Sequence, residues 1–260
     1  MSQESSGVPV SITEDQLLEV AGGDMFARAS WLSGRVTRGP WSRDGAHLWG
    51  VTHRGSPSIM GIGDAHGAAE LLPSVLAEHP DLAVASLPRG WVEHLSGVPV
   101  AVRDHWDWFA TTSAPQHVPG TERVGWLVDA DDEIRSLLSA ASPETSAWPG
   151  DERVHRWAGI RDGDGQLVAV LADTSKHVAV GHISSVATVR EHRRHGYGAA
   201  LTAWATQRFL ADGAAMVTLG MYADNHGARS MYERLGFTCC HRFTSATVGA
   251  PVDAAGATCE

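Results

Sequence analysis

A short glycine-containing segment near residue 195 constrains the fold more than any other part of this sequence. An apolar stretch, roughly 178–189, leads into Arg193-Arg194-His195-Gly196-Tyr197-Gly198, and an amphipathic helical pattern follows. A strand that ends in such a segment and opens a helix leaves several backbone N–H groups unpaired at the positive end of the helix dipole. The segment therefore predicts a site for anionic oxygens such as those of phosphate groups.

Two common phosphate-binding motifs do not describe this segment. A Walker A loop needs Gly-Lys-Ser or Gly-Lys-Thr, which occurs nowhere in the chain. A dinucleotide fingerprint needs a third Gly or Ala three residues after Gly198, where Leu201 stands. A basic helix start that is merely solvated remains an alternative when the segment is considered alone.

The overall charge argues against nucleic acid as the partner of this basic segment. The chain of 260 residues has a formal net charge of -10. Binding to a phosphate backbone needs a basic face, because counterion release supplies much of the affinity. We therefore expect no nucleic-acid partner and explain the local positive charge by a smaller anionic ligand.

The order of predicted elements indicates a mixed-sheet α/β fold. In the second half, apolar runs and turn signals predict the order β-α-β-β-β-α-β-α-β, with a hairpin at Asp162-Gly163-Asp164-Gly165. The first half is also mixed α/β and holds no phosphate-binding glycine motif. A segment rich in Thr, Ser, Pro and Gly, 111–122, predicts a linker, so we expect domains at 1–117 and 118–260.

A second motif lies downstream of the glycine segment, at Asn225, Ala228, Tyr232 and Gly236-Phe237. With both motifs in this order, the chain resembles the GNAT superfamily of acyl-CoA-dependent N-acyltransferases over about residues 122–243. The resemblance implies a GNAT fold in the C-terminal half. It also implies that the smaller mixed α/β N-terminal domain is a degenerate GNAT-like copy or a wall of the substrate cleft, as in two-domain members.

The resemblance implies that acetyl-CoA binds where the strand 178–189 splays away from the strand 215–222. Backbone groups of Ala187, Thr188 and Val189 would pair with the pantetheine arm and polarise the thioester carbonyl. Asn225 would contact the pantetheine, and its alternative role as a helix N-cap is compatible with that contact. The pyrophosphate would be held by the loop residues Arg193, Arg194, His195, Gly196, Tyr197, Gly198 and Ala199.

The same resemblance assigns candidate catalytic groups. Tyr232 matches the proton donor to the departing thiolate, although a half-buried structural tyrosine is the alternative. His182 lies where some members carry a catalytic Glu, so it is the candidate general base or, alternatively, a structural histidine on the strand. Ser184 shares its face by strand alternation and is a candidate for ordering a water. Trp126 and Trp148 are candidates for shaping the acceptor pocket.

We expect a cytoplasmic bacterial acetyltransferase that acts on a primary amine of a small molecule. A peptide or protein amine and a non-catalytic acyl-CoA-binding protein are the alternatives. Cys239, Cys240 and Cys259 fit neither a disulfide framework nor a zinc site, so no metal and no covalent acyl-enzyme are expected. No stretch is apolar enough to span a membrane, and the oligomeric state is left as monomer or homodimer.

Overall fold

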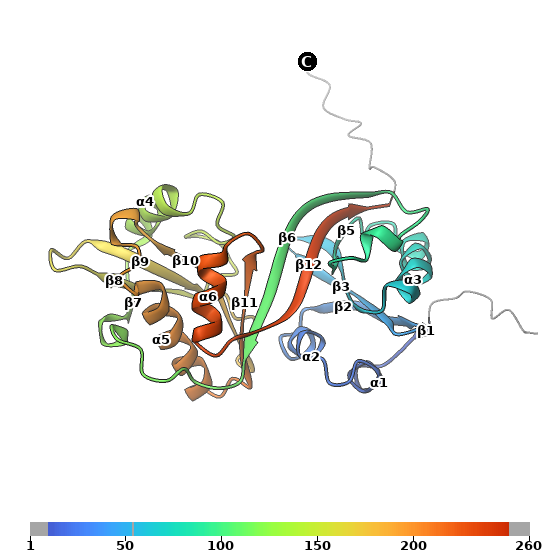
Figure 1. Ribbon diagram of the computed structural model, residues 1–260, viewed down its shortest axis with the longest axis horizontal. Coiled ribbons are helices and arrows are strands. Elements are labelled where there is room, and N and C mark those ends of the chain that lie inside the picture. Colours follow the sequence, from blue (N-terminus) through green and yellow to red (C-terminus); the bar gives the residue numbers. More distant parts are fainter. Residues whose placement is uncertain (1–9, 54, 250–260) are drawn as a thin grey trace, which may run out of the picture. The chain divides into compact units, whose positions relative to one another are not determined.

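The computed structural model describes residues 10–53 and 55–249 (Figure 1). Cys259 lies outside the described residues. The chain divides into two compact units. Unit 1 holds the described parts of 1–31, 35–106 and 242–260, and unit 2 holds 32–34 and 107–241.

This division differs from the boundary predicted between residues 117 and 118. The strands β6 (Val100–Thr111) and β12 (Thr238–Val248) each contribute residues to both units. The second part of β12 pairs antiparallel with β5 (Val84–Pro88), so the described end of the chain belongs to unit 1. The apolar pattern of a strand does not encode which partner it pairs with, and the sequence therefore placed the whole C-terminal segment in one domain.

Unit 2 contains one mixed sheet with the strand order β6-β11-β10-β9-β8-β7. The pairs β7–β8, β8–β9 and β9–β10 are antiparallel, whereas β10 and β11 are parallel and are connected by a helical crossover. The remaining elements are β7 (Gly125–Trp126), α4 (Asp131–Ala141), β8 (Arg156–Arg161), β9 (Leu167–Asp173), β10 (Val180–Thr188), α5 (Tyr197–Ala211), β11 (Met216–Tyr222) and α6 (His226–Arg234).

Local sequence signals explain where these elements begin and turn. Helix α4 starts with three acidic residues, which favour the positive end of the helix dipole. In the predicted hairpin between β8 and β9, Asp162 Oδ1 accepts from the backbone N–H groups of Asp164 and Gln166, and Gly165 has φ of 83°. The hairpin is therefore confirmed where the sequence predicts it.

Apolar side chains cover both faces of the unit 2 sheet. One cluster joins the sheet to α5 and α6 and includes Leu201, Phe209, Leu219 and Tyr232. A second cluster joins the opposite face to α4 through Ile134, Leu138, Trp157, Val170 and Ala187. A layered α/β arrangement of this kind positions the loops at the ends of the strands (Figure 1).

Unit 1 repeats the pairing pattern of unit 2. The strands β2 (Val36–Arg43), β3 (Ala46–His53) and β4 (Ser56–Gly63) are successive antiparallel neighbours. Helix α3 (Ala65–Glu78) then leads to β5, which runs parallel to β4. The remaining elements are β1 (Val10–Ser11), α1 (Glu14–Val20) and α2 (Met25–Leu32).

The helix of unit 1 that corresponds to α5 begins in a different way. The Asp64 carboxylate accepts from His66 N at 2.7 Å and thereby caps α3 with a negative charge. A Cβ on Gly63 would lie 2.0 Å from Gly45 O, so the neighbouring backbone packs directly against this turn. An acidic, closely packed helix start does not favour a phosphate group, so this end of α3 is not expected to bind one.

The described helices include none that is both long and apolar enough to cross a membrane.

Candidate active site

The parallel strands β10 and β11 pair only over their first residues. Their register runs from Val180↔Met216 to Ile183↔Leu219, whereas β10 continues to Thr188 and β11 to Tyr222. Beyond the last pair, the β11-facing edge of β10 lies outside this ladder. The splay expected between the two strands is therefore present in the structure.

A bulge marks the point where β10 leaves β11. Ser185 has φ of 52°, and the register with β9 shifts between Ser184 and Ala187. After the bulge, β10 stays paired with β9 on its other side, through Ala187↔Val170 and Thr188↔Ala169. The bulge thus interrupts the regular ladder just before Ala187 and Thr188, whose backbone groups are expected to meet the thioester.

The loop after β10 opens the first turn of α5. Arg194 and Gly196 have φ of 66° and 81°, and no side chain caps the N-terminus of α5. The left-handed conformation at Gly196 is one that glycine adopts at no steric cost. An uncapped helix start with the positive end of its dipole exposed is a suitable place for a pyrophosphate.

Two residues of the glycine segment also make structural contacts. The Arg193 guanidinium donates to Thr188 O at 3.2 Å and to Ala141 O at 2.9 Å. The Arg193 side chain therefore connects the loop to the last residue of α4. A Cβ on Gly198 would lie 3.3 Å from Met231 Sδ, so this glycine also permits close packing between α5 and α6.

Aromatic side chains line the outer part of the loop. The ring centroids of His192 and His195 lie 6.2 Å and 6.0 Å from that of Tyr197. Arg123 donates to the Tyr197 hydroxyl at 3.2 Å and lies over the ring. These contacts fix the side chains of His195 and Tyr197 beside the helix start, where Ala199 completes the first turn.

Asn225 is the N-cap of α6. Its Oδ1 accepts from Ala228 N at 3.1 Å, which is the capping role weighed as an alternative to cofactor contact. The cap occupies the carbonyl oxygen of the side chain and leaves the amide group to donate. Both predicted roles of Asn225 are thus chemically compatible.

Tyr232 lies on α6 with only 6% of its surface exposed. Its ring packs against Phe109 and Phe237, with centroid distances of 6.0 Å and 6.1 Å. Removal of the phenol from water raises the pKa of Tyr232 to about 12. The hydroxyl therefore keeps its proton at neutral pH, as a proton donor must.

His182 lies in the paired part of β10, directly opposite Thr218 of β11. The Thr218 hydroxyl donates to Gly181 O at 3.2 Å, and His182 Nδ1 lies 2.7 Å from Thr218 Oγ1. When the hydroxyl donates to Gly181 O, its oxygen accepts from Nδ1–H, which places the lone pair of the ring on Nε2. This tautomer is the one that a base acting through Nε2 requires.

His182 and Tyr232 belong to opposite faces of the sheet. Ile183 and Leu219 pack in the cluster that includes Tyr232, so strand alternation directs His182 and Thr218 to the α4 face. Ser184 lies on the same face as His182, and its hydroxyl is 2.7 Å from Thr174 Oγ1.

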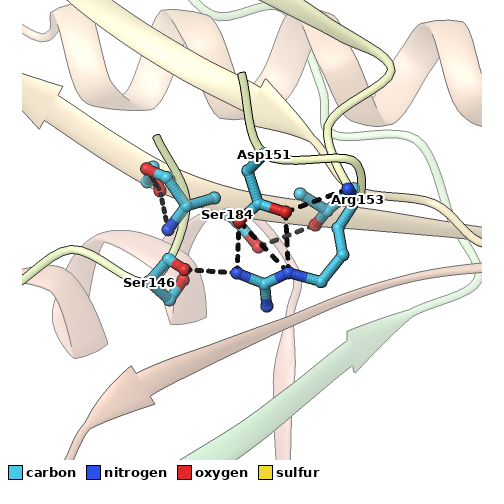
Figure 2. A network of polar contacts seen from close by, with 7 residues as sticks. Ser146, Asp151, Arg153 and Ser184 are labelled. Atoms are coloured by element: carbon cyan, nitrogen blue, oxygen red, sulfur yellow. Dashed lines mark hydrogen bonds and ion pairs between the residues drawn. The ribbon is translucent and has the colours of Figure 1, made fainter. Parts of the chain in front are cut away.

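A polar network from the segment between α4 and β8 lies on the α4 side. Asp151 accepts from Arg153 Nε at 2.9 Å, and Arg153 donates to Ser146 O at 2.7 Å (Figure 2). Ser185 donates to Ala147 O at 3.0 Å and so ties this segment to the bulge of β10. The close-up shows Ser184 in the same view as this network (Figure 2).

The sequence did not indicate Thr218, Asp151 or Arg153. The sequence holds one signal for Thr218, which is a polar residue among the apolar residues of a strand predicted to be buried. Asp151 and Arg153 come from an irregular segment, for which neither periodicity nor a motif gives a signal.

The two tryptophans considered for the acceptor pocket have different environments. Trp126 packs edge-on against Trp204 of α5 at 4.8 Å, and the Arg156 guanidinium lies 3.7 Å from its ring centroid. Trp126 therefore lies on the α5 face of the sheet, and its role in shaping an acceptor pocket stays a prediction. Trp148 packs against the cluster on the α4 face.

The described residues contain no group of three or more His, Cys, Asp or Glu side chains suited to hold a metal ion.

Comparison with known proteins agrees with the arrangement of the strands and helices. Residues 119–237 match the Acetyltransferase (GNAT) family. Comparison with the curated proteins gives no significant match.

Solved structures of GNAT proteins share the fold of the chain. An acetyltransferase of the GNAT family from Novosphingobium aromaticivorans is 22% identical, with a TM-score of 0.52 over 90% of this chain and 97% of its own. A GCN5-related N-acetyltransferase from Kribbella flavida is also 22% identical, with a TM-score of 0.53 over 86% and 94%. A GCN5-related N-acetyltransferase from Sphaerobacter thermophilus is 16% identical, with a TM-score of 0.50 over 78% and 76%.

At these identities, the structural likeness concerns the fold and does not identify a substrate. The family match itself covers the splayed strands, the glycine segment and Tyr232. Residues 119–237 therefore form a domain that matches the acetyltransferase (GNAT) family.

Proposed function

We propose that this protein transfers an acetyl group from acetyl-CoA to a primary amine of a small molecule, by direct attack in a ternary complex. One observation carries the proposal. The β10–β11 ladder ends at Ile183↔Leu219, and β10 then leads through a bulge to the uncapped start of α5. This arrangement offers backbone hydrogen-bonding groups in line with an anion site.

The main chain of the loop would bind the donor. The helix start at Gly196 would hold the pyrophosphate, and Arg194 would supplement it, since the Arg193 side chain is engaged with two carbonyl groups. Backbone groups of Ala187, Thr188 and Val189 would orient the pantetheine arm. When bound, acetyl-CoA supplies the activated acetyl thioester.

The side chains of two residues would move the protons. His182 Nε2 would accept a proton from the substrate ammonium, so that the neutral nitrogen attacks the carbonyl carbon. Backbone N–H groups at the end of β10 would stabilise the negative charge that develops on the carbonyl oxygen. As the carbon–sulfur bond breaks, the Tyr232 hydroxyl would donate its proton to the leaving sulfur.

The proposal does not use the described cysteines as nucleophiles. Cys239 and Cys240 lie on β12, and their thiols donate to the carbonyl oxygens of His241 and Thr238 in the same strand. Nucleophilic cysteines are activated by a neighbouring base or by a cationic site. A ternary complex is therefore proposed in place of an acyl-enzyme.

We propose that the acceptor is a small molecule and that the enzyme acts in the cytoplasm. The proposed oligomeric state is a monomer or a homodimer. The polar groups that support a small acceptor are His182, Ser184 and Thr174 on the α4 face.

A thiol-release assay with acetyl-CoA and a panel of amines tests this function. We expect amine-dependent release of CoA and formation of the N-acetyl product, detected by mass spectrometry. Calorimetry with CoA is the companion measurement. Binding of CoA without turnover on any small amine, peptide or protein would contradict the proposal and favour an acyl-CoA-binding protein.

A further inference from the structure

Asp107 is a buried carboxylate that the proposed mechanism does not use. It lies on β6 with 0% of its surface exposed. Burying a carboxylate costs free energy unless the charge is paired and hydrogen-bonded. The Arg229 side chain of α6 pairs with it, by a charge-assisted contact between Arg229 Nη2 and Asp107 Oδ2.

This ion pair lies next to the proposed general acid. Arg229 precedes Tyr232 by three residues on α6, so both side chains emerge on the same side of the helix. The Arg229 guanidinium carbon lies 5.5 Å from the centroid of Phe109, and the Phe109 ring lies 6.0 Å from that of Tyr232. Asp107 and Phe109 are two residues apart on β6, so both side chains lie on the same face of the strand, and both contact Arg229 of α6.

The strand thus holds α6 at two neighbouring points. Asp107 fixes the turn that contains Arg229, and Phe109 contacts both Arg229 and Tyr232. The other acidic partner of Arg229 is Glu233, which is half exposed and lies 3.7 Å away in an i,i+4 pair. Surface pairs of this kind contribute little, so the orientation of Arg229 depends mainly on the buried carboxylate.

We infer that Asp107 is a positioning residue that acts through Arg229 to fix the Tyr232 hydroxyl for proton transfer. The inference rests on the proposed function of Tyr232. A general acid works only within hydrogen-bond reach of the atom it protonates, and small displacements of such groups reduce rates strongly. A buried ion pair between the strand and the helix restricts α6 to one orientation.

A double-mutant cycle tests the inference. Asp107→Asn should lower kcat at least about tenfold and leave the KM for acetyl-CoA within about twofold. In a Tyr232→Phe background, the same substitution should produce no further loss of kcat, because the displaced group is already absent. Equal losses of kcat in both backgrounds would overturn the inference and assign Asp107 to general stability.

Matched variants separate positioning from folding. Glu233→Gln removes the exposed partner of the same arginine and should leave kcat unchanged. Asp107→Glu keeps the charge and should recover part of the activity lost in Asp107→Asn. If Asp107→Asn does not fold, Arg229→Lys is the second variant, because it keeps a cation and removes the planar guanidinium group. It should lower kcat in the wild-type background and should cause no further loss of kcat in the Tyr232→Phe background.

A measurement without turnover keeps the inference separate from the proposed function. The chain has three tyrosines, so 3-fluorotyrosine labelling should give three ¹⁹F resonances, and Tyr232→Phe assigns one of them. Asp107→Asn should shift or broaden the Tyr232 resonance, whereas Glu233→Gln should not. An unchanged Tyr232 resonance would overturn the inference, and absent turnover with a shifted resonance would count against the proposed function alone.

Discussion

His182 and Thr218 face each other across the parallel pair β10–β11, with 2.7 Å between His182 Nδ1 and Thr218 Oγ1. Thr218 is almost fully buried and also donates to Gly181 O. The contact orients the ring, and a hydroxyl that donates to Gly181 O favours the tautomer of His182 with the proton on Nδ1. Neighbouring strands thus provide the proposed base and a group that orients its ring.

Thr218→Val should lower kcat/KM about tenfold or more, because the tautomer with Nε2 unprotonated loses its hydrogen-bond partner at Nδ1. Thr218→Ser keeps the hydroxyl and is the matched control, with activity close to that of the wild type. Steady-state kinetics of both variants provide the measurement. Equal activity of the Val and Ser variants would show that the Thr218 hydroxyl does not act on His182.

His182→Ala should remove the acidic limb of the pH profile of kcat/KM. In the wild type, activity should fall at low pH, because a protonated imidazole cannot accept the proton of the substrate ammonium. We expect the variant to lose about 10²-fold or more in kcat/KM at neutral pH. A variant that retains the acidic limb would exclude His182 as the general base.

Tyr232 should make the folded protein sensitive to alkaline pH. The folded-state pKa of about 12 lies above the value of 10.0 for an unperturbed phenol, so the stability contribution is complete below pH 10 and is lost as the pH rises towards 12. Urea unfolding at pH 9 and 11 should show that the wild type loses roughly 1 kcal/mol more than Tyr232→Phe over this interval. Equal losses would mean that the phenol ionises at the same pH in the folded and unfolded states.

Gly196→Ala should weaken CoA binding more than Gly198→Ala. Gly196 has φ of 81°, which strains any residue with a Cβ, so the helix start that would hold the pyrophosphate is distorted at a cost of roughly 1 kcal/mol or more. At Gly198, the new Cβ would lie 3.3 Å from Met231 Sδ, the flexible end of that side chain, and 3.9 Å from Val186 Cγ1. Titration calorimetry with CoA compares the two. The reverse order of affinities would place the pyrophosphate elsewhere.

Much of unit 2 was predictable from its sequence. The hairpin at 162–165, the strand before the glycine segment, α5 and α6 each carry a local signal, and all are present in the structure. Each of these signals is a turn residue, a helix cap or an apolar period that acts over a few residues. The order of the elements then restricts the topology, because a parallel strand pair needs a crossover such as α5.

Long-range pairing was the part that the sequence did not reveal. Strand β6 combines exposed polar positions with the buried Asp107, so its pattern is not that of a regular strand. The partner of β12 in unit 1 comes from a distant part of the chain. The contacts of Thr218 and Arg229 likewise depend on which strands and helices become neighbours, and local periodicity carries no such information.

The most direct test of the account is the kcat of Tyr232→Phe with saturating acetyl-CoA and the best amine acceptor. We predict a loss of about 10²-fold or more in kcat with little change in the affinity for acetyl-CoA, because only the proposed proton donor to the leaving sulfur is removed. An unchanged kcat in a folded Tyr232→Phe variant would contradict the central claim.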